Sequence, residues 1–89
     1  KTTPAAREHV LRWQGSAPYF DLVLWRDGKR ILDSWPTEPQ LQLPTSWTYA
    51  GKQYRLTPGT YLWFVYPGIG QRARSHYGPL AASGSLTIG

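Results

Sequence analysis

The sequence predicts an all-β domain, a sandwich or a barrel, and three observations support this. Short runs with period-two alternation of apolar and polar residues recur along the chain, each followed by turn residues. No segment sustains apolar spacing at i, i+3, i+4 and i+7, and eight Pro and nine Gly interrupt every window long enough for a helix. Five Trp and six Tyr supply large rings for the core of a chain of only 89 residues.

Four predicted strands lie in the first half of the chain, at residues 10–14, 19–26, 29–35 and 40–43. The second and third are joined by Asp27-Gly28. Both of these residues accept a positive φ, so a two-residue type I′ hairpin is expected there. Gly15 to Pro18 and the Trp35-Pro36 pair are turn-forming segments that end the first and third strands.

Two further strands are predicted in the second half, at residues 60–66 and 83–88. Before them, residues 47–54 are expected to fold back as a small ribbon about Gly51-Lys52, since glycine suits the first central position of a type II′ turn. That register would place Tyr49 opposite Tyr54 as a cross-strand aromatic pair.

The alternation also separates a core face from an outer face of the predicted strands. Trp25, Phe64 and Tyr66 have the outward parity. We expect the core to contain the residues of the opposite parity, namely Leu11, Trp13, Phe20, Leu22, Leu24, Leu41, Leu43, Tyr61, Trp63, Val65, Leu86 and Ile88.

Three segments of the chain resemble fibronectin type III domains. They are Leu11-Arg12-Trp13, the Phe-x-Leu-x-Leu run that begins at Phe20, and Leu-Thr-Pro-Gly-Thr-Tyr-Leu-Trp-Phe-Val at residues 56–65. The resemblance extends from residue 4 to residue 88. It implies a seven-stranded, two-sheet antiparallel sandwich, immunoglobulin-like, as a single domain over residues 1–89. The connection between strands E and F, residues 44–58, is longer than in the family and holds the ribbon, at residues 46–56.

One position departs from the family in a way that affects a specific hydrogen bond. The family usually places two residues between its Pro-Gly and the tyrosine of its tyrosine corner, whereas here only Thr60 precedes Tyr61. The sequence therefore leaves open whether Tyr61 forms the hydrogen bond to the E–F connection that defines this corner.

The resemblance implies a function without catalytic residues, a protein-interaction or spacer module of a larger bacterial protein. The combination of Trp-Arg-Asp-Gly, Trp-Pro-Thr and Tyr-x-Trp-x-Val-x-Pro-Gly is most similar to domains of secreted or surface proteins of actinobacterial type. We therefore expect an extracellular or cell-surface location. Because the chain begins with Lys1 rather than Met, we also expect it to be an excised domain.

The composition argues against an enzyme, a metal site or a cofactor. The chain has no Cys, which removes disulfides, thiolate ligands and thiol nucleophiles together. His9 and His76 are its two imidazoles, and neither has a carboxylate or third ligand at motif spacing. Asp21 and Asp33 are expected on adjacent strands, where a metal or an Arg between them is one interpretation. Two solvated acids paired with Lys or Arg is the favoured one.

The net charge of +5 makes nucleic-acid binding an alternative function. It is the second alternative; the first is carbohydrate binding, which rests on the aromatic residues described next. The ten basic residues are spread along the chain without a block or a helical stripe, which argues against nucleic-acid binding. No apolar run approaches the ~18 residues that a membrane-spanning helix needs.

Aromatic residues give the first candidate surface. The outward rings, together with Trp47 in the ribbon, have two interpretations. In one, the ribbon folds over a sheet and buries these rings as a second small cluster. In the other, Trp25, Trp47 and Tyr66 form an exposed platform for carbohydrate stacking or for a partner protein, because contiguous apolar patches usually mark interaction sites.

The second candidate surface is the connection between strands F and G, residues 67–79. Arg72, Arg74 and His76 follow one another at a spacing of two, with Tyr77 beside them, so an extended segment would aim the first three the same way. One hypothesis is that this loop binds an acidic protein surface or an anionic surface polymer. The alternative is that Arg72 and Arg74 are solvated while Tyr77 packs at the base of the loop.

Overall fold

A computed structural model describes residues 9–69 and 77–88 and confirms the all-β prediction. This part of the chain contains no helix, and accordingly none that could cross a membrane. Its strands are β1 (Val10–Arg12), β2 (Phe20–Arg26), β3 (Lys29–Ser34), β4 (Gln40–Gln42), β5 (Ser46–Tyr49), β6 (Lys52–Arg55), β7 (Gly59–Pro67) and β8 (Ala82–Ile88). The strands predicted from alternation are all present, with bounds that differ by at most two residues.

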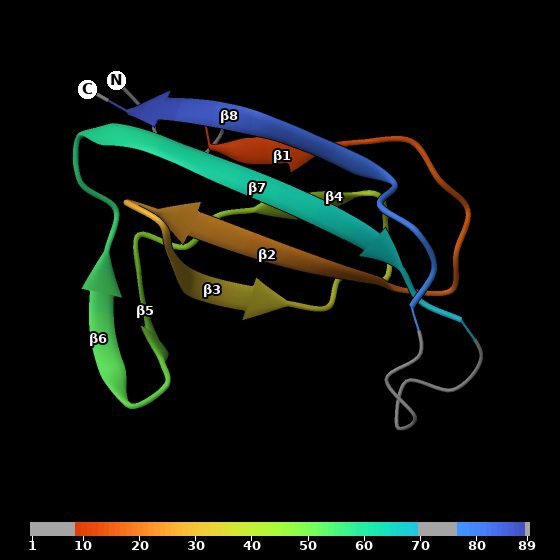
Figure 1. The fold of residues 1–89 in the computed structure, drawn as a ribbon, viewed down its shortest axis with the longest axis horizontal. Coiled ribbons are helices and arrows are strands. Elements are labelled where there is room, and N and C mark those ends of the chain that lie inside the picture. Colours follow the sequence, from red (N-terminus) through yellow and green to blue (C-terminus); the bar gives the residue numbers. More distant parts are fainter. Residues whose placement is uncertain (1–8, 70–76, 89) are drawn as a thin grey trace, which may run out of the picture.

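The strands form two layers and a projecting hairpin, and every described pairing is antiparallel. One layer is a four-stranded sheet in the order β3-β2-β7-β8, and the other is the pair β1-β4. Figure 1 shows β1 and β4 behind the large sheet and the β5–β6 hairpin extending from one end of it. The arrangement is sandwich-like, with apolar side chains of both layers in a common core.

The two hairpin turns share one geometry, which confirms one prediction and corrects another. Asp27 and Gly28 have φ of 54° and 76°, as a type I′ turn requires. The second hairpin turns at Ala50 and Gly51, with φ of 51° and 78°, and not at Gly51-Lys52. The predicted turn is therefore wrong by one residue, which changes the cross-strand partner of each residue by two positions.

The corrected register gives the second hairpin a different aromatic pair. Trp47, not Tyr49, lies opposite Tyr54, and the two rings stack with centroids 6.0 Å apart. A positive φ at an alanine costs about 1 kcal/mol, and an aromatic pair contributes a similar amount. Two effects together account for this register. The twist of a type I′ turn matches the twist of the strands, and the rings of Trp47 and Tyr54 stack.

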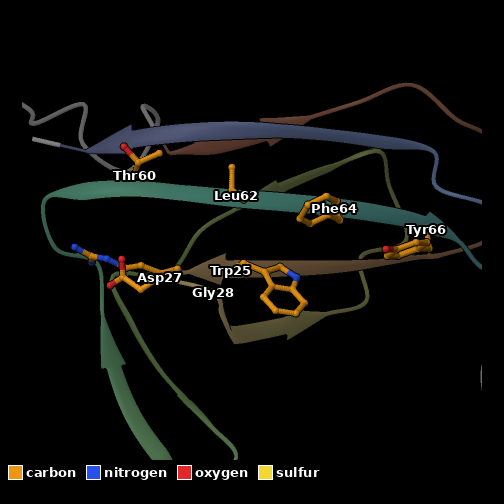
Figure 2. A pocket seen from close by; sticks show the side chains of 8 residues that line it. Trp25, Asp27, Gly28, Thr60, Leu62, Phe64 and Tyr66 are labelled. Atoms are coloured by element: carbon orange, nitrogen blue, oxygen red, sulfur yellow. The ribbon is translucent and has the colours of Figure 1, made fainter.

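Strand β7 separates the core from the outer face of the large sheet. It pairs with β2 on one side and β8 on the other. Tyr61 and Val65 are 1% and 0% exposed on its inner face. Leu62, Phe64 and Tyr66 lie on the other face (Figure 2), as their parity predicted.

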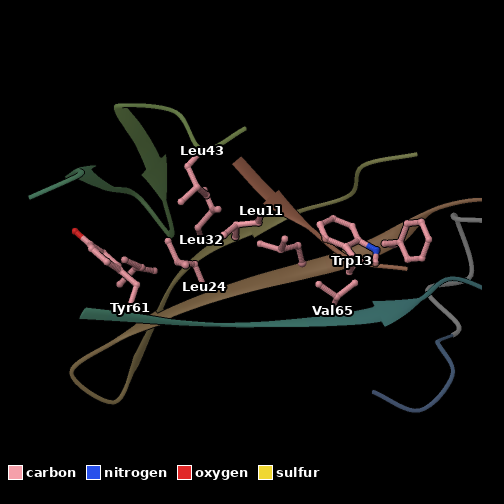
Figure 3. Packing of buried hydrophobic residues seen from close by; sticks show 10 residues of the cluster. Leu11, Trp13, Leu24, Leu32, Leu43, Tyr61 and Val65 are labelled. Carbon is pink, nitrogen blue, oxygen red and sulfur yellow. The ribbon is translucent and has the colours of Figure 1, made fainter. Parts of the chain in front are cut away.

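The core lies between the two layers. Figure 3 shows Leu11 and Trp13 on one side of it and Leu24 and Val65 on the other. Of the twelve predicted core residues eight are buried, while Leu41, Trp63, Leu86 and Ile88 are half-buried and pack against the core.

The core also holds residues that the alternation did not predict. Ile31 and Leu32 are both buried although they are adjacent in sequence. The reason is a register shift between β2 and β3: Leu24 pairs with Leu32 and Trp25 with Arg30, so Ile31 is the extra residue of a bulge. Tyr19 and Val23 are buried as well, although they do not belong to the cluster between the two layers.

Tyr61 forms a hydrogen bond to the segment before β7, which answers the question left open by the sequence. Its hydroxyl donates to the Thr57 carbonyl (2.9 Å) and accepts from the Thr57 N–H (3.0 Å) and from Nη1 of Arg26 (2.6 Å). All the hydrogen-bonding capacity of the phenol is therefore used. Arg26 also donates to the Thr57 hydroxyl and to the Pro58 carbonyl, and its guanidinium lies 4.7 Å from the centroid of the Tyr61 ring.

Gly59 makes room for this network at the start of β7. Its φ of 141° is a conformation that other residues rarely adopt. A Cβ at this position would lie far inside contact distance of Nη2 of Arg26. The Pro-Gly pair therefore allows Arg26 to approach the backbone of the β6–β7 connection.

Removal of the Tyr61 hydroxyl should destabilise the fold. In Tyr61→Phe, the Thr57 N–H and carbonyl and one Arg26 donor lose a partner, which should cost about 1–3 kcal/mol. Tyr66→Phe, on the opposite face of the same strand, is the matched control and should change stability by less than about 0.5 kcal/mol. Urea unfolding followed by circular dichroism measures both. Equal losses in the two variants would show that the network around Tyr61 adds nothing specific.

The facing of β7 can be tested with two neighbouring positions. Trp63 contacts Trp13 at a centroid distance of 6.4 Å and packs against the core, whereas Leu62 is 49% exposed. Trp63→Ala should lower the free energy of unfolding by about 3 kcal/mol, near the lower end for a large ring because the side chain is only half-buried. Leu62→Ala should cost less than about 1 kcal/mol. Melting temperatures that fall by the same amount would contradict the assigned facing.

Candidate functional site

The candidate site is a hollow on the outer face of the four-stranded sheet, with a volume of about 500 Å³. We call it the outer-face hollow. Figure 2 shows Leu62, Phe64 and Tyr66 following one another along β7, with Trp25 beside them on β2. Its lining residues are Trp25, Arg26, Asp27, Gly28, Thr60, Leu62, Phe64 and Tyr66.

The strand pairing explains why this hollow is aromatic. Because alternate β7 side chains point to opposite faces, burial of Tyr61 and Val65 sends Leu62, Phe64 and Tyr66 outward. The pairing of β1 with β4 covers the inner face, and no described strand covers the outer one. The result is a contiguous apolar surface at the centre of the sheet, bordered at one end by the Asp27-Gly28 turn.

The guanidinium of Arg30 lies over the ring of Trp25. Arg30 is its cross-strand neighbour, and the guanidinium carbon lies 5.5 Å from the centroid of the indole. This contact is a cation–π interaction of the kind that contributes about 0.5–1 kcal/mol at an exposed site. The indole that lines the outer-face hollow therefore has Arg30 beside it.

The structure brings together two of the three predicted platform residues. Trp25 and Tyr66 line the outer-face hollow, whereas Trp47 does not. The Trp47 indole N–H donates to the Ile31 carbonyl at 2.6 Å, and the side chain packs against the core. The platform of Trp25, Trp47 and Tyr66 is thus wrong as a single surface.

The alternative interpretation, in which the ribbon buries the outward rings, is also wrong. Through Trp47 the β5–β6 hairpin packs on β3 and against the core, and none of its residues lines the outer-face hollow. The physical reason is the hydrogen bond from the Trp47 indole to the Ile31 carbonyl, which holds the hairpin on the edge strand β3.

Asp21 and Asp33 are half-buried carboxyl groups that interact with each other. Burial, a hydrogen bond with Asp21 and the negative charge of Asp21 raise the pKa of Asp33 from 3.8 to about 7, although Arg30 and the backbone at Ser34 act in the opposite direction. The Oδ1 atoms of both residues are buried without a hydrogen-bond partner. The expectation of two solvated acids, each paired with Lys or Arg, is therefore wrong.

This pair does not belong to the outer-face hollow. Neither Asp21 nor Asp33 is among its lining residues. Within residues 9–69 and 77–88, no three His, Asp or Glu side chains come together as a metal site requires. A raised carboxyl pKa is also typical of acid–base catalysts, but burial, together with the neighbouring carboxyl group of Asp21, accounts for it here.

The second predicted surface can be placed only in part. Arg72, Arg74 and His76 lie outside the described residues. Tyr77 is half-buried, its hydroxyl accepts from the Trp35 indole N–H at 2.9 Å, and its ring meets Tyr19 edge-on at 6.1 Å. Tyr77 thus packs at the base of the connection, and binding of an acidic partner by this segment stays a prediction.

The interaction between Asp21 and Asp33 makes stability depend on pH in a defined direction. Since the pKa of Asp33 is raised from 3.8 to about 7, the folded protein holds a proton that the unfolded chain releases. Stability should therefore fall as the pH rises through this window. In Asp33→Asn this fall should disappear, because the amide is neutral throughout. Glu38→Gln, an exposed acid replaced by its amide, is the matched control and should keep the parent's slope.

Chemical denaturation at several pH values between about 4 and 8 measures this dependence. An Asp33→Asn variant with the same slope as the parent would show that the Asp21–Asp33 pair does not hold the proton.

No protein-family model, curated protein or solved structure matches this chain. The function is therefore argued from the strand order and from the outer-face hollow.

Proposed function

We propose that the chain is a fibronectin type III domain and that it acts as a non-catalytic interaction module of a larger protein. Two features support the domain type. In an immunoglobulin-like sandwich, strands C, F and G are neighbours in one sheet, and B pairs with E in the other. The order β2-β7-β8 and the pair β1-β4 fit this scheme. The hydrogen bonds of Tyr61 with Thr57 fit the tyrosine corner of such domains.

The single observation that carries the interaction function is the outer-face hollow. A contiguous apolar hollow on a small domain, bordered by polar groups, is typical of a binding site. Trp25 and Tyr66 belong to the residue types in which binding energy concentrates, and Arg30, over the Trp25 ring, adds the third such type. The proposed ligand is therefore another protein, with the domain also serving as a spacer in a chain exported from the cell.

Carbohydrate binding is the second candidate function. The same hollow offers aromatic rings for stacking and the polar side chains of Asp27 and Thr60 near them. Two facts make it the weaker candidate. Trp47 is on the core side, which leaves a smaller platform, and Arg30 already lies over the ring of Trp25.

The hollow can be tested by removing its rings while the fold is kept. The parent is immobilised, and the proteins that it retains from a cell extract are purified. Their affinity for the parent and for the double variant Trp25→Ala/Tyr66→Ala is then measured by calorimetry. We expect the variant to bind such a partner at least about tenfold more weakly, as loss of two central rings implies.

The matched control is Ile69→Ala/Leu80→Ala, which removes exposed apolar side chains that do not line the hollow. It should bind like the parent. Equal affinity of the parent and of Trp25→Ala/Tyr66→Ala would contradict the proposal.

Two further titrations decide between the candidates. A saturable change in tryptophan fluorescence with soluble glucan, xylan or peptidoglycan fragments, lost in Trp25→Ala/Tyr66→Ala, would favour carbohydrate. Binding of an oligonucleotide that weakens steeply with salt would favour nucleic acid.

A further inference from the structure

The four-stranded sheet has two edges, and they differ in how well they are protected. On the β3 edge, Lys29, Arg30 and Asp33 are charged, and the bulge at Ile31 interrupts the pairing. The carbonyl of Ile31 also already accepts a hydrogen bond from the Trp47 indole N–H. Charges, bulges and covering groups are the usual means by which proteins prevent an edge strand from pairing with another chain.

Within the described residues, the β8 edge has none of these protections. Ala82–Ile88 contains no charged residue and no proline, and its pairing with β7 runs from Gly59 to Val65 without a register shift. The described residues place no strand on its other side. A seven-residue edge of this kind presents a regular row of backbone donors and acceptors to an incoming strand.

The side chains of β8 have a pattern that suits pairing with itself. Consider two copies of β8 placed antiparallel, related by a two-fold axis through Ser85. On the core face, the small residues Ala82 and Gly84 then lie opposite Ile88 and Leu86 of the second copy. The pattern of small residues opposite large ones is what close packing across a strand pair requires.

The outer face of this pairing is polar and uncharged. There Ser83 lies opposite Thr87 of the second copy, and Ser85 lies opposite itself, so hydroxyl groups meet hydroxyl groups. Although the chain carries a net charge of +5, no like charges oppose each other along this edge. A heterologous partner would have no corresponding reason to match the order of small and large residues.

The core side of β8 also has apolar surface left to bury. Leu86 and Ile88 are half-buried, and so is Trp63, whose ring lies 2.8 Å from the position of a Cβ on Gly84. A leucine opposite Gly84 would lie beside this ring. The contact would thus continue the existing core.

We propose that β8 is a self-association edge, at which two copies of this chain pair antiparallel about Ser85 to form one eight-stranded sheet. The interface is isologous, since the same strand serves on both sides. Both outer-face hollows then lie on the same side of the joined sheet. The pairing does not depend on what those hollows bind.

Sedimentation velocity tests this proposal on the 89-residue chain. An interface of one strand pair is small, so association should be measured from about 10 µM to about 1 mM. We expect the parent to shift from monomer to dimer across this range. Ser85→Lys should stay monomeric, because it puts two like charges directly opposite each other. Its melting temperature should not change, since Ser85 is exposed.

Ser16→Lys is the matched control, because it adds the same charge at an exposed loop residue. This variant should dimerise like the parent. An equimolar mixture of Ser85→Lys and Ser85→Glu should form a dimer again through the opposite charges at the axis, whereas Ser85→Glu alone should stay monomeric. A parent that stays monomeric, or a Ser85→Lys variant that still dimerises, would overturn the proposal.

Discussion

The register of β7 against β2 is the constraint on which the rest of the structure depends. Because side chains alternate, a slip of one residue would exchange Tyr61 and Val65 for Leu62 and Phe64 in the core. The same slip would destroy the outer-face hollow. The hydrogen bonds from Tyr61 to Thr57 and from Arg26 to Tyr61 and Pro58 fix the point at which β7 begins, relative to the end of β2. Core and candidate site therefore share one structural origin.

The parts of the fold that follow from local alternation could be predicted from the sequence, and those set by pairing could not. Asp27-Gly28 specifies its turn, and the parity of β7 correctly placed Phe64 and Tyr66 outward. Burial of both Ile31 and Leu32 required a bulge, which depends on a partner strand. The position of Trp47 was missed for the same reason, because its indole bonds to the carbonyl of that bulge.

The candidate site was predictable only as a list of outward rings. Sequence parity identified Trp25 and Tyr66, but not that Arg30 would lie over the indole. Arg30 also lowers the pKa of Asp33, against the larger effects of burial and of Asp21. One cation therefore acts on both an aromatic ring and an acid of the outer face. Trp25 lies on β2, whereas Arg30 and Asp33 lie on β3. Their proximity therefore follows from the β2–β3 register.

The side chains around Trp25 on the outer face also bear on the kind of ligand. A platform for sugars needs ring faces that are open, whereas Trp25 shares its ring with a guanidinium. Arg next to Trp and Tyr is instead the combination found at the centres of protein interfaces, where few residues supply most of the affinity. With Leu62 49% exposed beside these rings, the hollow has the apolar centre that a protein partner would cover. The arrangement of these side chains thus favours a protein ligand over a carbohydrate.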